Sequence, residues 1–164
     1  MITRRMLRIY FAIAVTLFSA LILEILPLPT WFLWCRPEWM LLVILFWVLF
    51  YPSWVSVGIA WCVGFTLDIF TSTLLGEHAL AMTVVAYLLY RLHRQVRLFP
   101  LWQQSLLIAI LVTLYQTIIF IIQGLIGQAP LTWWYWSSVW VSMLLWPCVV
   151  FLLRGWCEKW RLNT

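Results

Sequence analysis

The sequence predicts an all-α membrane protein with six transmembrane helices and both termini in the cytoplasm. Hydrophobic residues make up 66% of its 164 residues and charged residues only 9%, whereas soluble domains carry about 25% charged residues. The apolar residues form long runs, and a helix needs about 20 of them to cross a bilayer. A soluble domain with one core is therefore excluded. The length predicts one transmembrane bundle over residues 1–164.

Proline, glycine and charged residues divide the apolar runs into six expected spans. Pro52 separates the second span from the third, because the apolar run around it, about 32 residues, is too long for one crossing. Pro100 opens the fifth span, and Gly76 lies between the third and the fourth. The expected spans cover residues 6–26, 38–51, 54–71, 78–92, 101–125 and 134–153.

The distribution of basic residues predicts the orientation. Cytoplasmic segments of membrane proteins carry an excess of lysine and arginine. With the N-terminus inside, Arg36 is the one basic residue of ten that falls outside. The formal charge of +5 is therefore attributed to topology, and nucleic acid is not an expected partner. The nine basic residues on the cytoplasmic side are Arg4, Arg5, Arg8, Arg91, Arg94, Arg97, Arg154, Lys159 and Arg161.

The third span places the carboxylate of Asp68 on a stripe of small residues. Steps of four residues back from Asp68 reach Gly64, Ala60 and Ser56, and small residues let a neighbouring helix approach closely in lipid. A charge facing lipid would cost about 2.5–3.5 kcal/mol, so Asp68 is expected to point into the bundle or at water. Two interpretations stay open: a buried polar residue that ties two helices together, or a ligand or ion site.

Three further residues extend this expected helix-packing surface or partner or ligand groove. Glu24 ends a similar stripe in the first span and is expected at a depth similar to that of Asp68. Gln116 is expected to form hydrogen bonds across helices in the fifth span. Pro147 is expected to kink the sixth helix, because proline removes a backbone hydrogen bond.

The sequence contains no recognisable catalytic, cofactor or metal motif, so a non-enzymatic protein without a cofactor is expected. His78 and His93 fall on opposite membrane faces in the predicted topology, so they cannot share a metal ion. His78, with Glu77, could touch Asp68 across a short outer turn, although Glu77 is explained more simply as an acid in the first turn of a helix. Arg36 could pair with its neighbour Glu38 or with Glu24.

Motifs follow one another in order along nearly the whole chain. They are Arg36-Pro37-Glu38-Trp39; Gly64-Phe65-Thr66-Leu67-Asp68 with Leu75-Gly76 and His78-Ala79-Leu80; Leu101-Trp102-Gln103-Gln104-Ser105; and Leu145-Trp146-Pro147 with Leu152-Leu153-Arg154. Together they resemble the MreD family of rod shape-determining proteins of Gram-negative bacteria. The resemblance implies a multi-pass protein of the cell inner membrane that supports cell shape and lateral peptidoglycan synthesis. It implies MreC as a direct partner, MreB, RodA and penicillin-binding protein 2 in the same complex, and no catalytic residue.

The six-helix layout is also similar to the substrate-binding subunits of energy-coupling-factor vitamin transporters. The first function is therefore a membrane scaffold, and the alternative is a subunit that binds a vitamin-like small molecule for a transporter. Short expected outer loops favour the scaffold because they leave little material for a lid. An enzyme acting on a lipid-linked precursor lacks a reactive pair. Membrane lipid is an expected partner, and self-association stays open.

Overall fold

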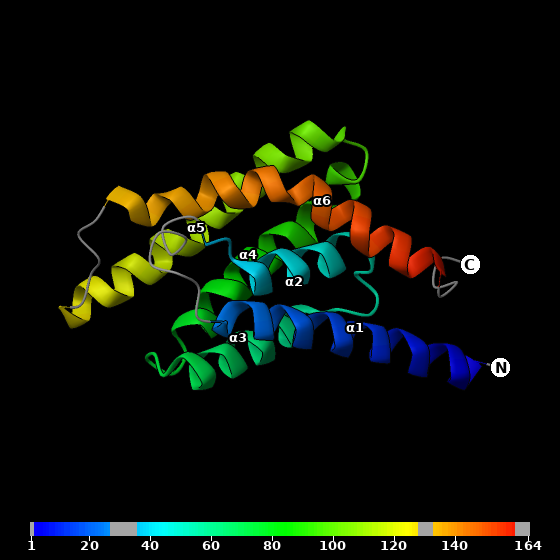
Figure 1. Cartoon of the computed structure of the whole chain (residues 1–164), viewed down its shortest axis with the longest axis horizontal. Helices are drawn as coiled ribbons and strands as arrows, with labels where there is room; N and C mark the ends of the chain where they lie inside the picture. Colours follow the sequence, from blue (N-terminus) through cyan, green and yellow to red (C-terminus); the bar gives the residue numbers. More distant parts are fainter. Residues whose placement is uncertain (1, 27–35, 128–132, 160–164) are drawn as a thin grey trace.

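The computed structural model describes residues 2–26, 36–127 and 133–159, with the backbone alone for residues 2–5 and 134. The all-α prediction is confirmed: helices account for the secondary structure throughout these three ranges (Figure 1). The elements are α1 (Ile2–Ile25), α2 (Trp39–Phe50), α3 (Val57–Thr71), α4 (Glu77–Val96), α5 (Leu101–Ile126), the short 3-10 helix η2 (Trp133–Trp136) and α6 (Ser137–Lys159).

Three helices are long and apolar enough to cross a membrane. They are the Met6–Ile25 part of α1, α5 and α6. α2 and α3 are apolar but shorter, with 12 and 15 residues, and α4 ends in a polar turn containing His93 and Arg94. The chain is therefore a membrane protein by composition and helix length, while the crossing of α2, α3 and α4 stays a prediction.

Several helix ends differ from the expected spans, because helical hydrogen bonding does not stop where hydropathy falls. α1, α4 and α6 continue past their apolar parts, and α6 runs through Pro147 to Lys159. α3 begins later than expected, at Val57. After Pro52 the chain first turns, with the N–H groups of Trp54 and Val55 both donating to the carbonyl of Tyr51.

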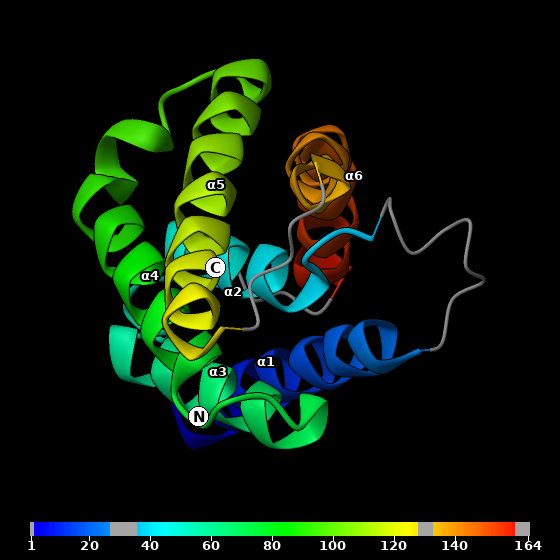
Figure 2. The ribbon, with the colours of Figure 1, turned by 90° about the vertical axis from the view of Figure 1, so that its left-hand side faces the viewer.

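α2 is the centre of the bundle. All ten residues from Met40 to Leu49 are buried, and α2 packs against α1, α4 and α6. Figure 2, which looks along the bundle, shows α2 between these helices. A helix of 12 residues is only about 18 Å long, shorter than the roughly 30 Å hydrocarbon core of a bilayer. Because protein surrounds α2, its length is matched to its neighbours rather than to lipid.

The carboxyl-terminal end of α2 is held by Arg97, the residue that follows α4. The Nε–H group of Arg97 donates to the carbonyl oxygen of Leu49 at 2.7 Å, and its Nη2 group donates to that of Phe50. The last carbonyls of a helix have no partner within the helix, and a cation near them is favourable. The guanidinium of Arg154 in α6 lies 4.3 Å from the centre of the Phe50 ring, so two helices anchor this end of α2.

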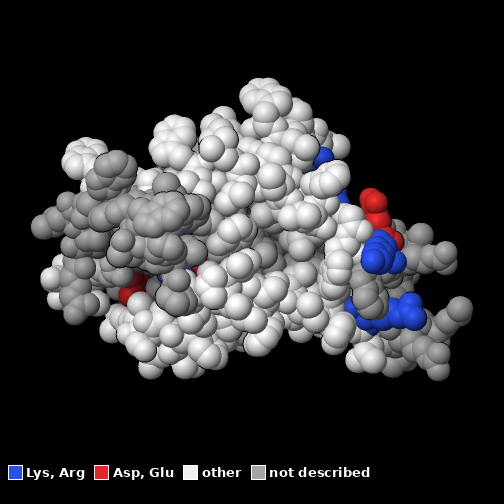
Figure 3. Space-filling model, viewed as in Figure 1, with Lys and Arg blue, Asp and Glu red and all other residues white. Residues whose placement is uncertain are grey.

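Charged side chains lie toward the two ends of the molecule on the face seen in Figure 3, and the middle of that face is uncharged. Large apolar side chains of the outer helices are exposed, including Phe18 of α1, Ile110 of α5 and Phe151 of α6. An apolar middle with charged ends is the surface expected of a bundle embedded in a membrane.

Candidate functional site

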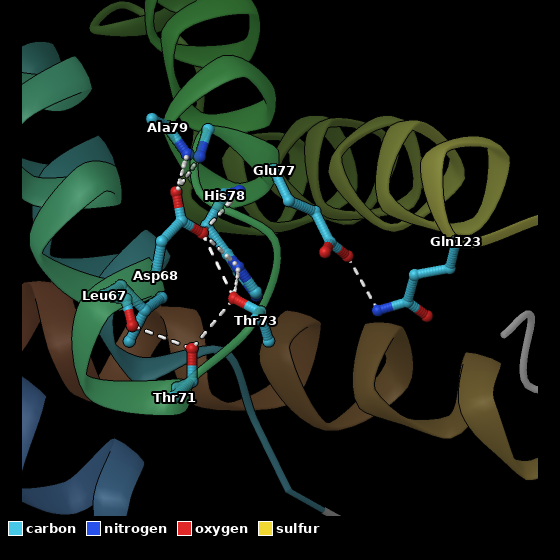
Figure 4. A network of polar contacts seen from close by, with 9 residues as sticks. Leu67, Asp68, Thr71, Thr73, Glu77, His78, Ala79 and Gln123 are labelled. Atoms are coloured by element: carbon cyan, nitrogen blue, oxygen red, sulfur yellow. Dashed lines mark hydrogen bonds and ion pairs between the residues drawn. The ribbon is translucent and has the colours of Figure 1, made fainter. Parts of the chain in front are cut away.

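Asp68, at the end of α3, is fully buried and binds the beginning of α4 (Figure 4). Its Oδ2 atom accepts hydrogen bonds from the backbone N–H groups of Gly76 at 2.8 Å and Ala79 at 3.4 Å. Its Oδ1 atom accepts one from the N–H group of His78 at 2.9 Å. The first N–H groups of a helix lack partners within it, and Gly76 at the N-cap has no side chain to supply one. The carboxylate from the preceding helix takes that role.

Side chains in the α3–α4 turn complete the surroundings of Asp68. The Nδ1 atom of the His78 ring lies 2.8 Å from its Oδ1 atom, and the hydroxyl of Thr73 donates to the same oxygen at 3.3 Å. The backbone reaches this arrangement through left-handed conformations at Ser72 and Gly76, with φ of 53° and 100°. Every strong partner of Asp68 belongs to this turn, so the geometry matches a polar residue that joins two helices.

Glu77 does not join His78 at Asp68. It is buried in the first turn of α4, and its Oε1 atom accepts a hydrogen bond from the side-chain amide of Gln123 in α5 at 2.7 Å. Figure 4 shows the two groups side by side, with Gln123 reaching across from α5. Glu77 therefore has the favourable position of an acid at a helix N-terminus and also connects α4 to α5.

The stripe of small residues on α3 faces α4 over part of its expected length. A Cβ atom added to Gly64 would lie 2.5 Å from the Cα atom and 2.8 Å from the N atom of Ala79, so only a hydrogen fits there. Ala60 is fully buried. Ser56 is the N-cap residue that precedes α3 and is exposed, so it does not extend the buried surface.

Glu24, at the end of α1, accepts a hydrogen bond from the first turn of α2, just as Asp68 does from the first turn of α4. It is 8% exposed, and its Oε2 atom accepts a hydrogen bond from the backbone N–H group of Met40, in the first turn of α2, at 3.3 Å. Its Oε1 atom lies 3.9 Å from the Nε atom of Arg36, which selects Glu24 over Glu38 as the partner of this arginine. Two helices of the bundle thus end in a carboxylate that caps the next helix.

Gln116 and Pro147 lie apart from each other. Gln116 is 1% exposed and sits beside the Glu38 carboxyl group, and its backbone carbonyl accepts a hydrogen bond from the Tyr135 hydroxyl at 3.3 Å. Pro147 lines a separate cavity of about 270 Å³ between α5 and α6, together with Leu101. The residues predicted to form one surface or groove therefore divide between separate places in the fold.

A cavity of about 470 Å³ opens near Glu24 and Asp68. We call it the outer pocket, and its lining consists of Glu24, Ile25, Arg36, Glu38, Leu67, Phe70, Thr71 and His78. Sequence reasoning suggested the Glu24–Arg36 pair and a groove that includes Glu24 and Asp68, but it did not predict the set of residues that lines this cavity. The signal available was the charged pair around Pro37, because it is expected at the same outer end as Glu24 and His78. Among the described residues, no group of three or more His, Cys, Asp or Glu residues could hold a metal ion.

Comparison with known proteins decides the family. The family model for "rod shape-determining protein MreD" matches residues 3–156. The chain belongs to the MreD family. A rod shape-determining protein MreD from Haemophilus influenzae is 34% identical over 144 residues, which cover 88% of this chain and 89% of that protein. No solved structure matches the chain.

Membership of the MreD family confirms the resemblance drawn from the motifs and assigns the chain a role in rod-shape determination. MreD proteins are a shape-determining structural family. The match spans all six α-helices of the described structure, from α1 into α6, so it includes Glu24, Asp68 and the outer pocket. The likeness to energy-coupling-factor subunits stays a prediction.

Proposed function

We propose that this chain is a non-enzymatic scaffold of the rod complex that binds MreC directly and works with MreB, RodA and penicillin-binding protein 2. Its task would be to support lateral peptidoglycan synthesis from within the cell inner membrane. The observation that carries the proposal is the MreD family match over nearly the whole chain. The contacts of Asp68 are consistent with a structural role for this residue, because its carboxylate is engaged by Gly76, His78 and Thr73.

We further propose that all six helices cross the membrane, with both termini in the cytoplasm. The arginine-rich end of α4 supports this orientation, since Arg91 and Arg94 near that end, and Arg97 just after it, lie opposite His78 at the beginning of the helix. α2 can take part despite its length because it is enclosed by other helices. The exposed apolar faces of α1, α5 and α6 are then available to lipid and to the transmembrane helices of partners.

The test is to identify the proteins that co-purify with a tagged copy from native membranes in mild detergent. We expect MreC together with the cell-wall synthases. An unrelated tagged six-helix membrane protein, produced at the same level, controls for proteins that bind any apolar surface. Recovery of ATPase subunits with a bound vitamin-like molecule, and no MreC, would contradict the scaffold and favour the transporter subunit.

A further inference from the structure

The outer pocket concentrates ionisable groups in a chain that has few of them. The sequence contains five acidic residues, and two of them, Glu24 and Glu38, line this one cavity with Arg36 and His78. Charged groups are costly at membrane depth, so where they gather they indicate a functional site by default. The contacts of Asp68 account for its own burial, but they do not account for this second group of charges.

The wall of the pocket is divided by polarity. Glu24, Arg36, Glu38 and His78 form its polar side, while Ile25, Leu67 and Phe70 form an apolar side. Ile25 and Phe70 are 44% and 57% exposed, so they lie at the rim, between the ends of α1 and α3. A pocket with a charged interior and an apolar rim on the outer surface of a membrane bundle fits an amphiphile better than a wholly water-soluble molecule.

Polar atoms around the pocket have unused hydrogen-bonding capacity. The Nε atom of Arg36 is buried and has no hydrogen-bond partner among the described residues, and 3.9 Å to Glu24 exceeds hydrogen-bond length. In Gln116, beside Glu38, the buried Oε1 atom is likewise without a partner in the described part of the chain. A buried polar atom left unpaired is costly, so a ligand that pairs with Arg36, which lines the pocket, is favoured.

The chemical groups that line the outer pocket indicate the class of ligand that it binds. A guanidinium binds phosphate oxygens well, and carboxylates accept hydrogen bonds from an ammonium group. His78 already uses Nδ1 at Asp68, which leaves Nε2 as its second polar atom. We propose that the outer pocket binds a zwitterionic headgroup, with an ammonium group held between Glu24 and Glu38 and a phosphate held by Arg36. The apolar rim would take the beginning of an acyl chain.

This headgroup could be part of a phosphatidylethanolamine in the membrane or belong to a soluble molecule such as glycerophosphoethanolamine. The proposal goes beyond the scaffold role, because it concerns a ligand of this chain alone and does not depend on any protein partner.

The test uses the full chain, purified in detergent and depleted of lipid, with its melting temperature measured against added ligand. Short-chain phosphatidylethanolamine should raise the melting temperature saturably. Short-chain phosphatidylcholine, whose quaternary ammonium has no N–H donor, should bind at least about tenfold more weakly. Saturable binding of glycerophosphoethanolamine with similar affinity would identify a soluble headgroup as sufficient, whereas binding of the lipid alone would identify the membrane as the source.

Substitutions test whether the lipid binds in the outer pocket. Glu38→Gln and Arg36→Gln should each weaken phosphatidylethanolamine binding about tenfold or more. Glu158→Gln and Arg94→Gln remove the same charges far from the pocket and should leave the affinity unchanged. Equal binding of the two lipids by the unaltered chain, or the absence of saturable binding, would overturn the proposal without relying on any variant. Unchanged affinity in both pocket variants would also overturn it.

Discussion

At the residue scale, Asp68 shows how a membrane helix tolerates a carboxylate. Its charge meets the free N–H groups of α4 and the ring of His78 rather than lipid. The sequence predicted that Asp68 points into the bundle or at water, and it offered His78 and Glu77 as residues that could touch it. It could not predict which backbone groups would bind the carboxylate, because these depend on the left-handed turn through Ser72 and Gly76.

Replacing Asp68 tests whether its hydrogen bonds or its charge matter more. Asp68→Asn keeps one acceptor oxygen but places an NH₂ group against backbone donors. We therefore expect the free energy of unfolding to fall by about 1–3 kcal/mol. Asp68→Leu removes both acceptors and should cost more, about 3 kcal/mol or above. SDS titration of the protein in detergent micelles measures both. Equal losses would indicate that the negative charge is what α4 requires. Glu158→Gln, on an exposed residue, is the control.

Gly64 and Gly58 form a matched pair on α3. A Cβ atom at Gly64 would collide with the backbone of Ala79, so Gly64→Ala should destabilise the protein by about 1–3 kcal/mol. A Cβ atom at Gly58 meets only the Ser56 hydroxyl oxygen at 3.7 Å. Gly58→Ala should therefore be neutral or stabilising by up to about 1 kcal/mol, because alanine favours helices. Comparison of the two unfolding curves checks this, and equal effects would show that α3 and α4 do not meet closely at Gly64.

At the scale of elements, the sequence predicted the existence of each helix better than its ends. Hydropathy located the apolar part of α1, α4 and α6, but their hydrogen bonding continues into polar sequence. The short second span was predicted within one residue at each end. Its central position was not predictable, because the apolar run of α2 does not specify whether lipid or protein surrounds it.

The cap at the end of α2 gives a prediction for that element. Arg97→Gln removes the guanidinium that binds the carbonyls of Leu49 and Phe50. Because Arg97 is partly in solvent, we expect the free energy of unfolding to fall by only about 1 kcal/mol. Arg94→Gln, one turn earlier on α4 and without a hydrogen bond in the described structure, should leave stability unchanged. Chemical unfolding of the two variants in the same detergent measures both changes in stability. Equal losses of stability would argue against the cap.

At the scale of the whole molecule, composition was enough to predict an all-α membrane protein, and motif order was enough to identify the family. The candidate site was predicted only in part. Asp68, Glu24 and Gly64 were singled out, but the outer pocket depends on Glu24 and His78 meeting across two helix ends. Residues 54 positions apart in the chain come together there only through tertiary packing, which no local pattern encodes.

The predicted topology can be tested by cysteine labelling in a variant whose four native cysteines are replaced by serine. Arg94→Cys should react with a membrane-impermeant maleimide only after the membrane is permeabilised. Trp31→Cys, at a position outside the described residues, should react in intact spheroplasts. The expectation follows from the excess of arginine at the α4 end. The reverse labelling pattern would show that the bundle has the opposite orientation in the membrane.

The two caps of α2 also set an order of assembly during synthesis. Glu24 precedes α2 in the chain, so the acceptor for its first turn is already made when α2 emerges. The donor for its last turn comes 47 residues after Phe50, which takes several seconds at roughly 5–20 residues per second. In the proposed topology, α2 is therefore made with the acceptor for its first turn already present and the donor for its last turn still to come, and it is fully enclosed only once α4 and α6 have been made.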